Sequence, residues 1–386
     1  MKSIMRTLGI FVFGILFSIA AVAGVVIYAQ QEGGDSPDTP EIESTKVETP
    51  EVRNWQPGRV GERVKLHRDL IDSLGTAKIL DRYGQSLIVG DFQDMRIKRF
   101  NPAGNFMKAY GVPSGRSEEA FEHYLGYAMT ESGRLYVLDH GKRRMTAFQL
   151  ESGARLFDKE LDYQPYRVTA VGGFVVVHAA MTDSLFRVYD PEGNLEATFS
   201  PFPKNMENGA FDLVGDLIPF PQRELFIYAP SGASYLFYYD LQGNEVKEVI
   251  TPDRNLFRAK GTGKFRDMDI FGKEKDQTSD SAYADSSGAR EIPERTRTYD
   301  LDTDGQYIYA SVSKLNTQNP QGFSLVDVFR LDTGEYVESF RLPTEANDVV
   351  VMGGVLYYLD RRSDSVHAYR IRRGISSGEA VAAEES

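Results

Sequence analysis

A short apolar run followed by an aromatic residue and a glycine recurs along the chain. In the first copy, residues 87–91 form the run, Phe100 lies nine positions after its end, and Gly104 follows. Runs of this length between turn residues are typical of β-strands joined in hairpins. Five further copies have their aromatic residue and glycine at Phe148 and Gly153, Tyr189 and Gly193, Tyr239 and Gly243, Phe329 and Gly334, and Tyr369 and Gly374.

The repeat predicts a β-propeller. A strand such as residues 77–81 precedes each copy and, in five copies, a strand such as 105–110 follows it, so that each unit supplies the four strands of a blade. The sixth unit lacks its fourth strand. Residues 62–70 begin with alternating apolar and charged positions and can supply it, which would cover an open sheet edge. The expected fold class is all-β: a six-bladed β-propeller over residues 59–374, closed by an N-terminal strand.

The N-terminal segment has the pattern of a membrane anchor. Residues 8–29 contain no charge, and as a helix they would extend about 33 Å, enough for a hydrocarbon core of about 30 Å. Lys2 and Arg6 precede them and acidic residues follow, which predicts a cytoplasmic stub at 1–7, one transmembrane helix and an extracytoplasmic remainder. A cleaved signal peptide is the alternative, because Ala21-Val22-Ala23 resembles a cleavage site.

Other segments lack the repeat pattern. Residues 30–58 are acidic and contain four prolines, which predicts a flexible linker ending near Trp55. A long polar insertion at 251–296 separates the fourth and fifth units, and 311–322 is inserted within the fifth unit. Residues 375–386 form a polar tail, expected to be disordered.

Composition excludes several classes of function. The net charge of −12, from 44 basic and 56 acidic residues, argues against a nucleic-acid partner, which requires a basic surface. The chain has no cysteine, so disulfides, thiolate metal sites and cysteine nucleophiles are excluded. The five histidines are scattered and the single Trp lies in the linker, and we expect no cofactor.

Two units also resemble the NHL repeat, in which an Asp ends the second strand of a blade and an Arg begins the third. Asp139 and Arg144 match this pattern within residues 135–148, and Asp91 and Arg96 match it in the first unit. The sixth unit keeps Asp360 but has Ser365 in place of the Arg. The resemblance implies an NHL-like or TolB-like six-bladed propeller of a bacterium. Together with the predicted anchor at residues 8–29, this leads us to expect a protein of the inner membrane with its propeller on the periplasmic or extracellular side. Members of that group include binding modules, lyases and lactone hydrolases.

Few residues qualify as a chemical site. We expect Asp91 with Arg96, and Asp139 with Arg144, to be structural pairs that order loops, with Asp360 in the same role. Asp300, Asp302 and Asp304 match the first half of a calcium loop, but Ile308 and Ser311 occupy the positions of its later ligands. An ordinary acidic turn is therefore favoured over a calcium site.

These observations favour a binding or scaffolding module over an enzyme. The membrane is one expected partner, through residues 8–29. A protein or small ligand is expected on the face with the 251–296 and 311–322 segments, because binding residues are often displayed on loops of a rigid scaffold. A propeller enzyme of the lyase or lactone-hydrolase type, with a metal at the central channel, is the alternative. A purely structural envelope protein is a third.

Overall fold

A computed structural model describes residues 44–113, 119–179, 184–200, 213–231, 233–253, 295–316 and 319–372. The expected stub, anchor and tail, the first part of the linker and most of the 251–296 insertion lie outside these residues. Within the described ranges, no helix has the length and apolar character needed to cross a bilayer.

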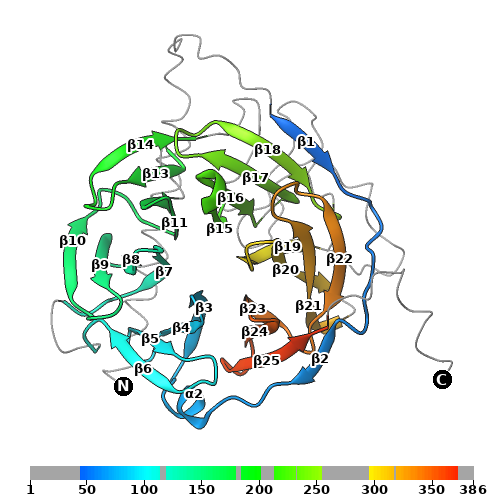
Figure 1. The fold of residues 1–386 in the computed structure, drawn as a ribbon, viewed down its shortest axis with the longest axis horizontal. Helices are drawn as coiled ribbons and strands as arrows, with labels where there is room; N and C mark the ends of the chain where they lie inside the picture. Colours follow the sequence, from blue (N-terminus) through cyan, green and yellow to red (C-terminus); the bar gives the residue numbers. More distant parts are fainter. Residues whose placement is uncertain are drawn as a thin grey trace, which may run out of the picture.

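Six antiparallel sheets form a ring, with β3, β7, β11, β15, β19 and β23 innermost (Figure 1). This confirms the six-bladed β-propeller. Blade 1 has β3 (Ala77–Tyr83), β4 (Ser86–Asp91), β5 (Arg96–Phe100) and β6 (Phe106–Tyr110); blade 2 has β7 (Tyr124–Met129), β8 (Arg134–Asp139), β9 (Arg144–Gln149) and β10 (Arg155–Glu160); blade 3 has β11 (Arg167–Val171), β12 (Phe174–His178), β13 (Phe186–Tyr189) and β14 (Leu195–Phe199).

Blades 4 to 6 complete the ring, and the last of them draws its outer strand from the N-terminal region. Blade 4 has β15 (Gly215–Phe220), a short 3₁₀ turn (Pro221–Arg223), β16 (Leu225–Pro230), β17 (Tyr235–Asp240) and β18 (Glu245–Ile250); blade 5 has β19 (Arg295–Thr303), β20 (Tyr307–Asn316), β21 (Asn319–Arg330) and β22 (Tyr336–Arg341); blade 6 has β23 (Ala346–Met352), β24 (Val355–Asp360), β25 (Val366–Ile371) and β2 (Val60–Arg63).

The core lies between adjacent blades. Every residue of β4 and β16 is buried, because both faces of these strands pack against other sheets. Between blades 6 and 1, Leu359 and Val350 pack with Val89. Each such side chain contributes about 1.5–3 kcal/mol by its burial. The hairpin turns need glycine: Gly243 has a φ of 91°, and a Cβ there would lie 2.4 Å from Phe199.

An N-terminal strand closes the ring as expected, but its position differs from the prediction. β2 pairs antiparallel with β25, with Val60 opposite Ile371, and the Val64 amide continues the pairing by donating to Ala368 O at 2.8 Å. Residues 62–70 are therefore not one strand. The chain leaves the sheet after Val64 and forms the short helix α2 (Arg68–Asp72), whose Leu70 is buried against the core.

The last part of the predicted linker lies against the propeller. Residues 44–63, which we call the strap, run along the outside of blades 4, 5 and 6 (Figure 1). β1 (Thr45–Glu48) pairs parallel with β18 and makes blade 4 a five-stranded sheet. Trp55 forms a bridge with Ser339 of β22, and its ring lies 5.2 Å from the Arg341 guanidinium. The flexible-linker prediction is thus wrong for residues 44–58.

One arginine fastens the strap between blades 4 and 5. The Arg53 guanidinium donates to both carboxylate oxygens of Asp327 on β21, each at 2.9 Å, and to both of Asp253, which follows β18. The side chains of Arg53, Asp253 and Asp327 are only 7%, 7% and 1% exposed. Two carboxylates beside this guanidinium raise its pKa further above its ordinary value against the opposing effect of burial.

Candidate functional site

The innermost strands of the six blades enclose a cavity of about 210 Å³ on the ring axis. Its wall combines apolar side chains with five aspartates and two arginines, an excess of three carboxyl groups. These seven residues are Asp81 and Arg82 on β3, Arg167 on β11, Asp216 on β15, Asp300 and Asp302 on β19, and Asp348 on β23.

Channel aspartates link blade 4 to blade 5 and blade 5 to blade 6. Asp216 accepts a hydrogen bond from the Leu301 amide at 2.8 Å, and Asp300 accepts one from the Val349 amide at 2.6 Å. In each case the acceptor stands on one inner strand and the donor on the next. A buried amide needs such an acceptor, because leaving it unpaired costs about 1–3 kcal/mol.

Two further aspartates continue this pattern around the axis. Asp302 accepts a hydrogen bond from the Val351 amide at 2.6 Å, which adds a second link between blades 5 and 6. Asp348 accepts one from the Leu80 amide at 2.8 Å, which joins blade 6 to blade 1 across the point of ring closure.

Other side chains link the remaining blades. Arg167 of blade 3 donates to Leu125 O of blade 2 at 2.6 Å, and its Nε lies 3.5 Å from Asp216 of blade 4. The Tyr127 hydroxyl of blade 2 donates to Ile79 O of blade 1 at 3.1 Å. Arg82 donates to Thr303 O and lies 3.6 Å from Asp302. Every pair of adjacent blades is therefore joined at the channel by a polar side chain.

Burial shifts the protonation of the channel carboxyl groups. It raises the pKa of Asp81 to about 8, of Asp348 to about 7 and of Asp302 to about 6. Burial and the neighbouring carboxylates raise the pKa of Asp300 well above its usual range, and burial also raises that of Asp216. Water stabilises an ionised carboxylate better than a protein interior does. Burial therefore favours the protonated form and raises the pKa.

The structure separates the three aspartates of the predicted calcium loop. Asp300 and Asp302 lie on β19 and face the channel, so they do not belong to the acidic turn that we expected. Asp304 lies in the hairpin turn after β19, where it accepts from the Gln306 amide at 2.9 Å and the Tyr309 hydroxyl at 2.9 Å. Among the residues that the structure describes, no three His, Asp or Glu side chains are grouped to hold a metal ion.

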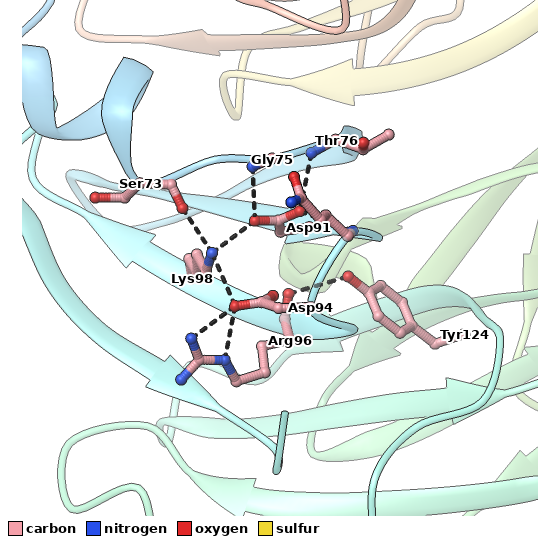
Figure 2. A network of polar contacts seen from close by, with 9 residues as sticks. Ser73, Gly75, Thr76, Asp91, Asp94, Arg96, Lys98 and Tyr124 are labelled. Atoms are coloured by element: carbon pink, nitrogen blue, oxygen red, sulfur yellow. Dashed lines mark hydrogen bonds and ion pairs between the residues drawn. The ribbon is translucent and has the colours of Figure 1, made fainter. Parts of the chain in front are cut away.

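Asp91 of the repeat motif orders two loops at once. It accepts from the Gly75, Thr76 and Gln93 amides, each at 3.0 Å, and pairs with Lys98 at 2.6 Å (Figure 2). Arg96, which we expected to pair with Asp91, instead donates to Asp94 at 2.6 and 2.9 Å.

Asp139 and Asp360 have comparable surroundings in blades 2 and 6. Asp139 accepts from the Glu122 amide at 2.9 Å and lies 3.9 Å from Arg144. Asp360 accepts from the Arg362 amide at 2.8 Å and the Ser363 amide at 3.0 Å. All three motif aspartates thus bind backbone amides of the loops beside them.

The expected partner-binding face has a different shape from the one predicted. Residues 311–322 are not a loop inserted between two strands. β20 and β21 continue through this segment and stay paired as far as Asn316 opposite Asn319. Arg295, where the chain returns from the 251–294 connection, lies opposite Leu315 near the end of this hairpin. The 251–294 connection therefore returns to the propeller beside the end of the β20–β21 hairpin.

Sequence reasoning missed the charged ring of the channel. Asp81, Asp216 and Asp348, with Arg82 and Arg167, all lie in first strands of blades. The available signal was a charged residue within an otherwise apolar inner strand, which occurs in five of the six blades.

Comparisons with known proteins agree with the fold and go no further. No family model matches the chain, and no curated protein matches it. A member of the duf4221 family from Bacteroides vulgatus is 10% identical, with a TM-score of 0.52 over 81% of this chain and 97% of that one. A protein from Bacteroides fragilis is 9% identical, with a TM-score of 0.50 over 86% and 100%. Virginiamycin B lyase from Staphylococcus aureus is 7% identical, with a TM-score of 0.46 over 81% and 99%. At such identities the likeness shows a β-propeller fold alone.

Proposed function

We propose that this chain is a binding or scaffolding module of the bacterial inner membrane, an NHL-like or TolB-like propeller anchored through residues 8–29. Its partner, a protein or a small ligand, binds the face where the 251–296 insertion and the β20–β21 hairpin emerge. The adjacency of these two excursions, with Arg295 opposite Leu315, is the observation on which the proposal rests. A rigid scaffold that displays its longest segments together at one place is typical of a recognition surface.

The channel geometry favours binding over catalysis. Four of the five channel aspartates accept backbone amides of the neighbouring blade, and both arginines contact carbonyl oxygens or carboxylates. These groups are therefore engaged in joining blades. A catalytic acid or base, in contrast, must reach the substrate within hydrogen-bond distance.

The course of the strap supports an orientation of the propeller on the membrane. Ser44 donates to Glu245 at 2.6 Å, beside the turn that joins β17 and β18, and β1 runs parallel to β18 from there. The chain therefore reaches the propeller on the side of the tight hairpin turns. Between residue 29 and Ser44 it can extend at most about 50 Å. We therefore propose that the tight-turn face lies on the side of the bilayer and that the insertion face points into the periplasm, within the freedom that this tether allows.

Replacing the insertion tests the proposal. In one variant residues 254–292 become a short Gly-Ser linker; in the control, Glu192 and Gln242 on the tight-turn side become Ala. Both are used for affinity capture from solubilised membranes of the native organism. We expect the first variant to melt like the unmodified protein and to lose at least about tenfold of specific capture, while the control retains it. Undiminished capture by the linker variant contradicts the proposal.

A propeller enzyme is the second candidate, because five carboxyl groups with raised pKa values surround one cavity. The metal that such lyases use does not fit the residues as they stand, since the described side chains include no three-ligand group. We expect a chelator to leave the melting temperature unchanged, since a bound metal would stabilise the fold by mass action. A decrease that calcium reverses would show that the folded protein holds a calcium ion and would contradict this expectation.

A further inference from the structure

The central channel contains more carboxyl groups than guanidinium groups to pair with them. The two guanidiniums pair with Asp302 at 3.6 Å and with Asp216 at 3.5 Å. Asp81, Asp300 and Asp348 then have no ion-pair partner within 4.0 Å among the described residues. Each inner strand contributes as follows: Asp81 and Arg82 from β3, the Tyr127 phenol from β7, Arg167 from β11, Asp216 from β15, Asp300 and Asp302 from β19, and Asp348 from β23.

Five carboxyl groups that line one cavity of about 210 Å³ cannot all remain ionised without a cost in free energy. Like charges that share a low-dielectric site repel one another, and the usual relief is the uptake of a proton by one of them. The blade-to-blade bonds survive that uptake. A protonated carboxyl group keeps its carbonyl oxygen as the acceptor for the Leu301, Val349 or Leu80 amide, and it gains an O–H that can donate to a neighbouring carboxylate.

We propose that the channel is a proton-operated clamp: its aspartates take up protons as the surroundings acidify through neutral pH, which tightens the ring of blades, and release them in alkaline medium, which loosens it. The clamp depends only on the inner strands, so it holds whether or not the insertion face binds a partner.

The sign follows from the protons bound in each state. An unfolded chain has these aspartates near pKa 3.9 and binds no proton on them at neutral pH. The folded chain binds protons on them, because burial raises the pKa of Asp81 to about 8 and of Asp348 to about 7. Stability therefore rises as the pH falls through this range and is lost again as the pH rises. His178 acts in the opposite direction below about pH 6.5, because burial lowers its pKa to about 3.

Asp348→Asn tests the clamp in the full-length protein. The amide oxygen can still accept the Leu80 N–H, but the side chain can no longer bind or release a proton. Asp162→Asn, which neutralises an exposed aspartate after β10, is the matched control. Melting temperatures of the three proteins are measured from pH 5 to pH 8. Comparison between variants cancels the contribution of His178, which all three share.

When the pH is lowered from 7 to 5, we expect the folding equilibrium constant of the wild type to increase about 50-fold relative to that of Asp348→Asn. The melting temperature of the wild type should then rise by about 3 °C relative to that of the variant. Asp162→Asn should follow the wild type at every pH. Parallel curves for the wild type and Asp348→Asn overturn the proposal. If Asp348→Asn does not fold, Asp81→Asn replaces it, since among the described residues Asp81 accepts from the adjacent Arg82 amide and from no amide of another blade. A retained wild-type slope in that variant overturns the proposal equally.

Discussion

Replacing Arg53 should detach the strap and destabilise the whole ring. In Arg53→Met, the buried carboxylates of Asp253 and Asp327 lose four hydrogen bonds to this guanidinium. Removing one partner of a buried ion pair costs about 3–5 kcal/mol, because the remaining charge is left uncompensated.

The size of the effect can be converted to a melting temperature. With about 2.1 cal/mol/K of unfolding entropy per residue, the roughly 330 residues of strap and propeller have about 0.7 kcal/mol/K, which predicts a decrease of about 4–7 °C. Differential scanning calorimetry measures this decrease. Limited proteolysis within the strap, at residues 44–52, should accelerate in parallel, since β1 on the outer edge of blade 4 would no longer be held at its far end.

Two further variants separate this explanation from a general sensitivity to substitution. Arg68→Met removes an exposed arginine and should shift the melting temperature by less than about 1 °C. Adding Asp253→Asn and Asp327→Asn to Arg53→Met removes the two buried negative charges and should recover part of the loss. If Arg53→Met melts within 1 °C of the wild type, the ion pairs of Arg53 with Asp253 and Asp327 do not stabilise the fold as argued.

Three other predictions concern closure, membrane attachment and pH. A chain that begins at Gly75 lacks β2 and should lose the cooperative unfolding of a chain that begins at Ser44; equal melting temperatures would show that β2 does not close the ring. The full-length protein should stay in the membrane fraction after a carbonate wash, whereas a mature N-terminus near Gly24 or Gln30 on sequencing would establish cleavage. Below about pH 6.5 the unfolded chain takes up a proton at His178 that the folded chain does not, because burial lowers the pKa of this side chain to about 3. His178→Gln should therefore remove about a 100-fold loss in the folding equilibrium between pH 7.5 and pH 4.5, measured by urea unfolding; an unchanged loss would refute this cause.

The propeller could be predicted because its signal is local and repeated. Second strands such as β4 and β16 are buried on both faces, so they appear as continuous apolar runs. Their hairpin turns require glycine with positive φ, as at Gly104 and Gly243. Strand length and turn chemistry together keep the aromatic residue at a constant spacing from the run.

The strap could not be predicted because its partners are remote in the chain. Residues 44–58 have the proline and acidic content of a linker, and nothing near them suggests a strand. Arg53 binds Asp253 and Asp327, 200 and 274 positions away. A contact at such separation leaves no periodic trace in a single sequence.

The candidate site was missed for a related reason. Asp300 and Asp302 matched a calcium loop by spacing, yet their alternation places them on one face of a strand, directed at the channel. Asp216 and Asp348 drew no attention as isolated charges in apolar strands. Their role depends on amides of other blades, Leu301 and Leu80, which only the closed ring brings within reach.

Proton release on unfolding tests the central claim, that the channel carboxyl groups join the blades and hold protons in the folded ring. The protein is unfolded by guanidinium in weakly buffered solution at pH 7.5, and the protons are counted by back-titration. We expect roughly one to two protons to be released per chain, because unfolding returns Asp81, Asp300 and Asp348 to pKa values near 3.9. Asp81→Asn should release fewer protons than the wild type. No release, or a net uptake, would contradict the account.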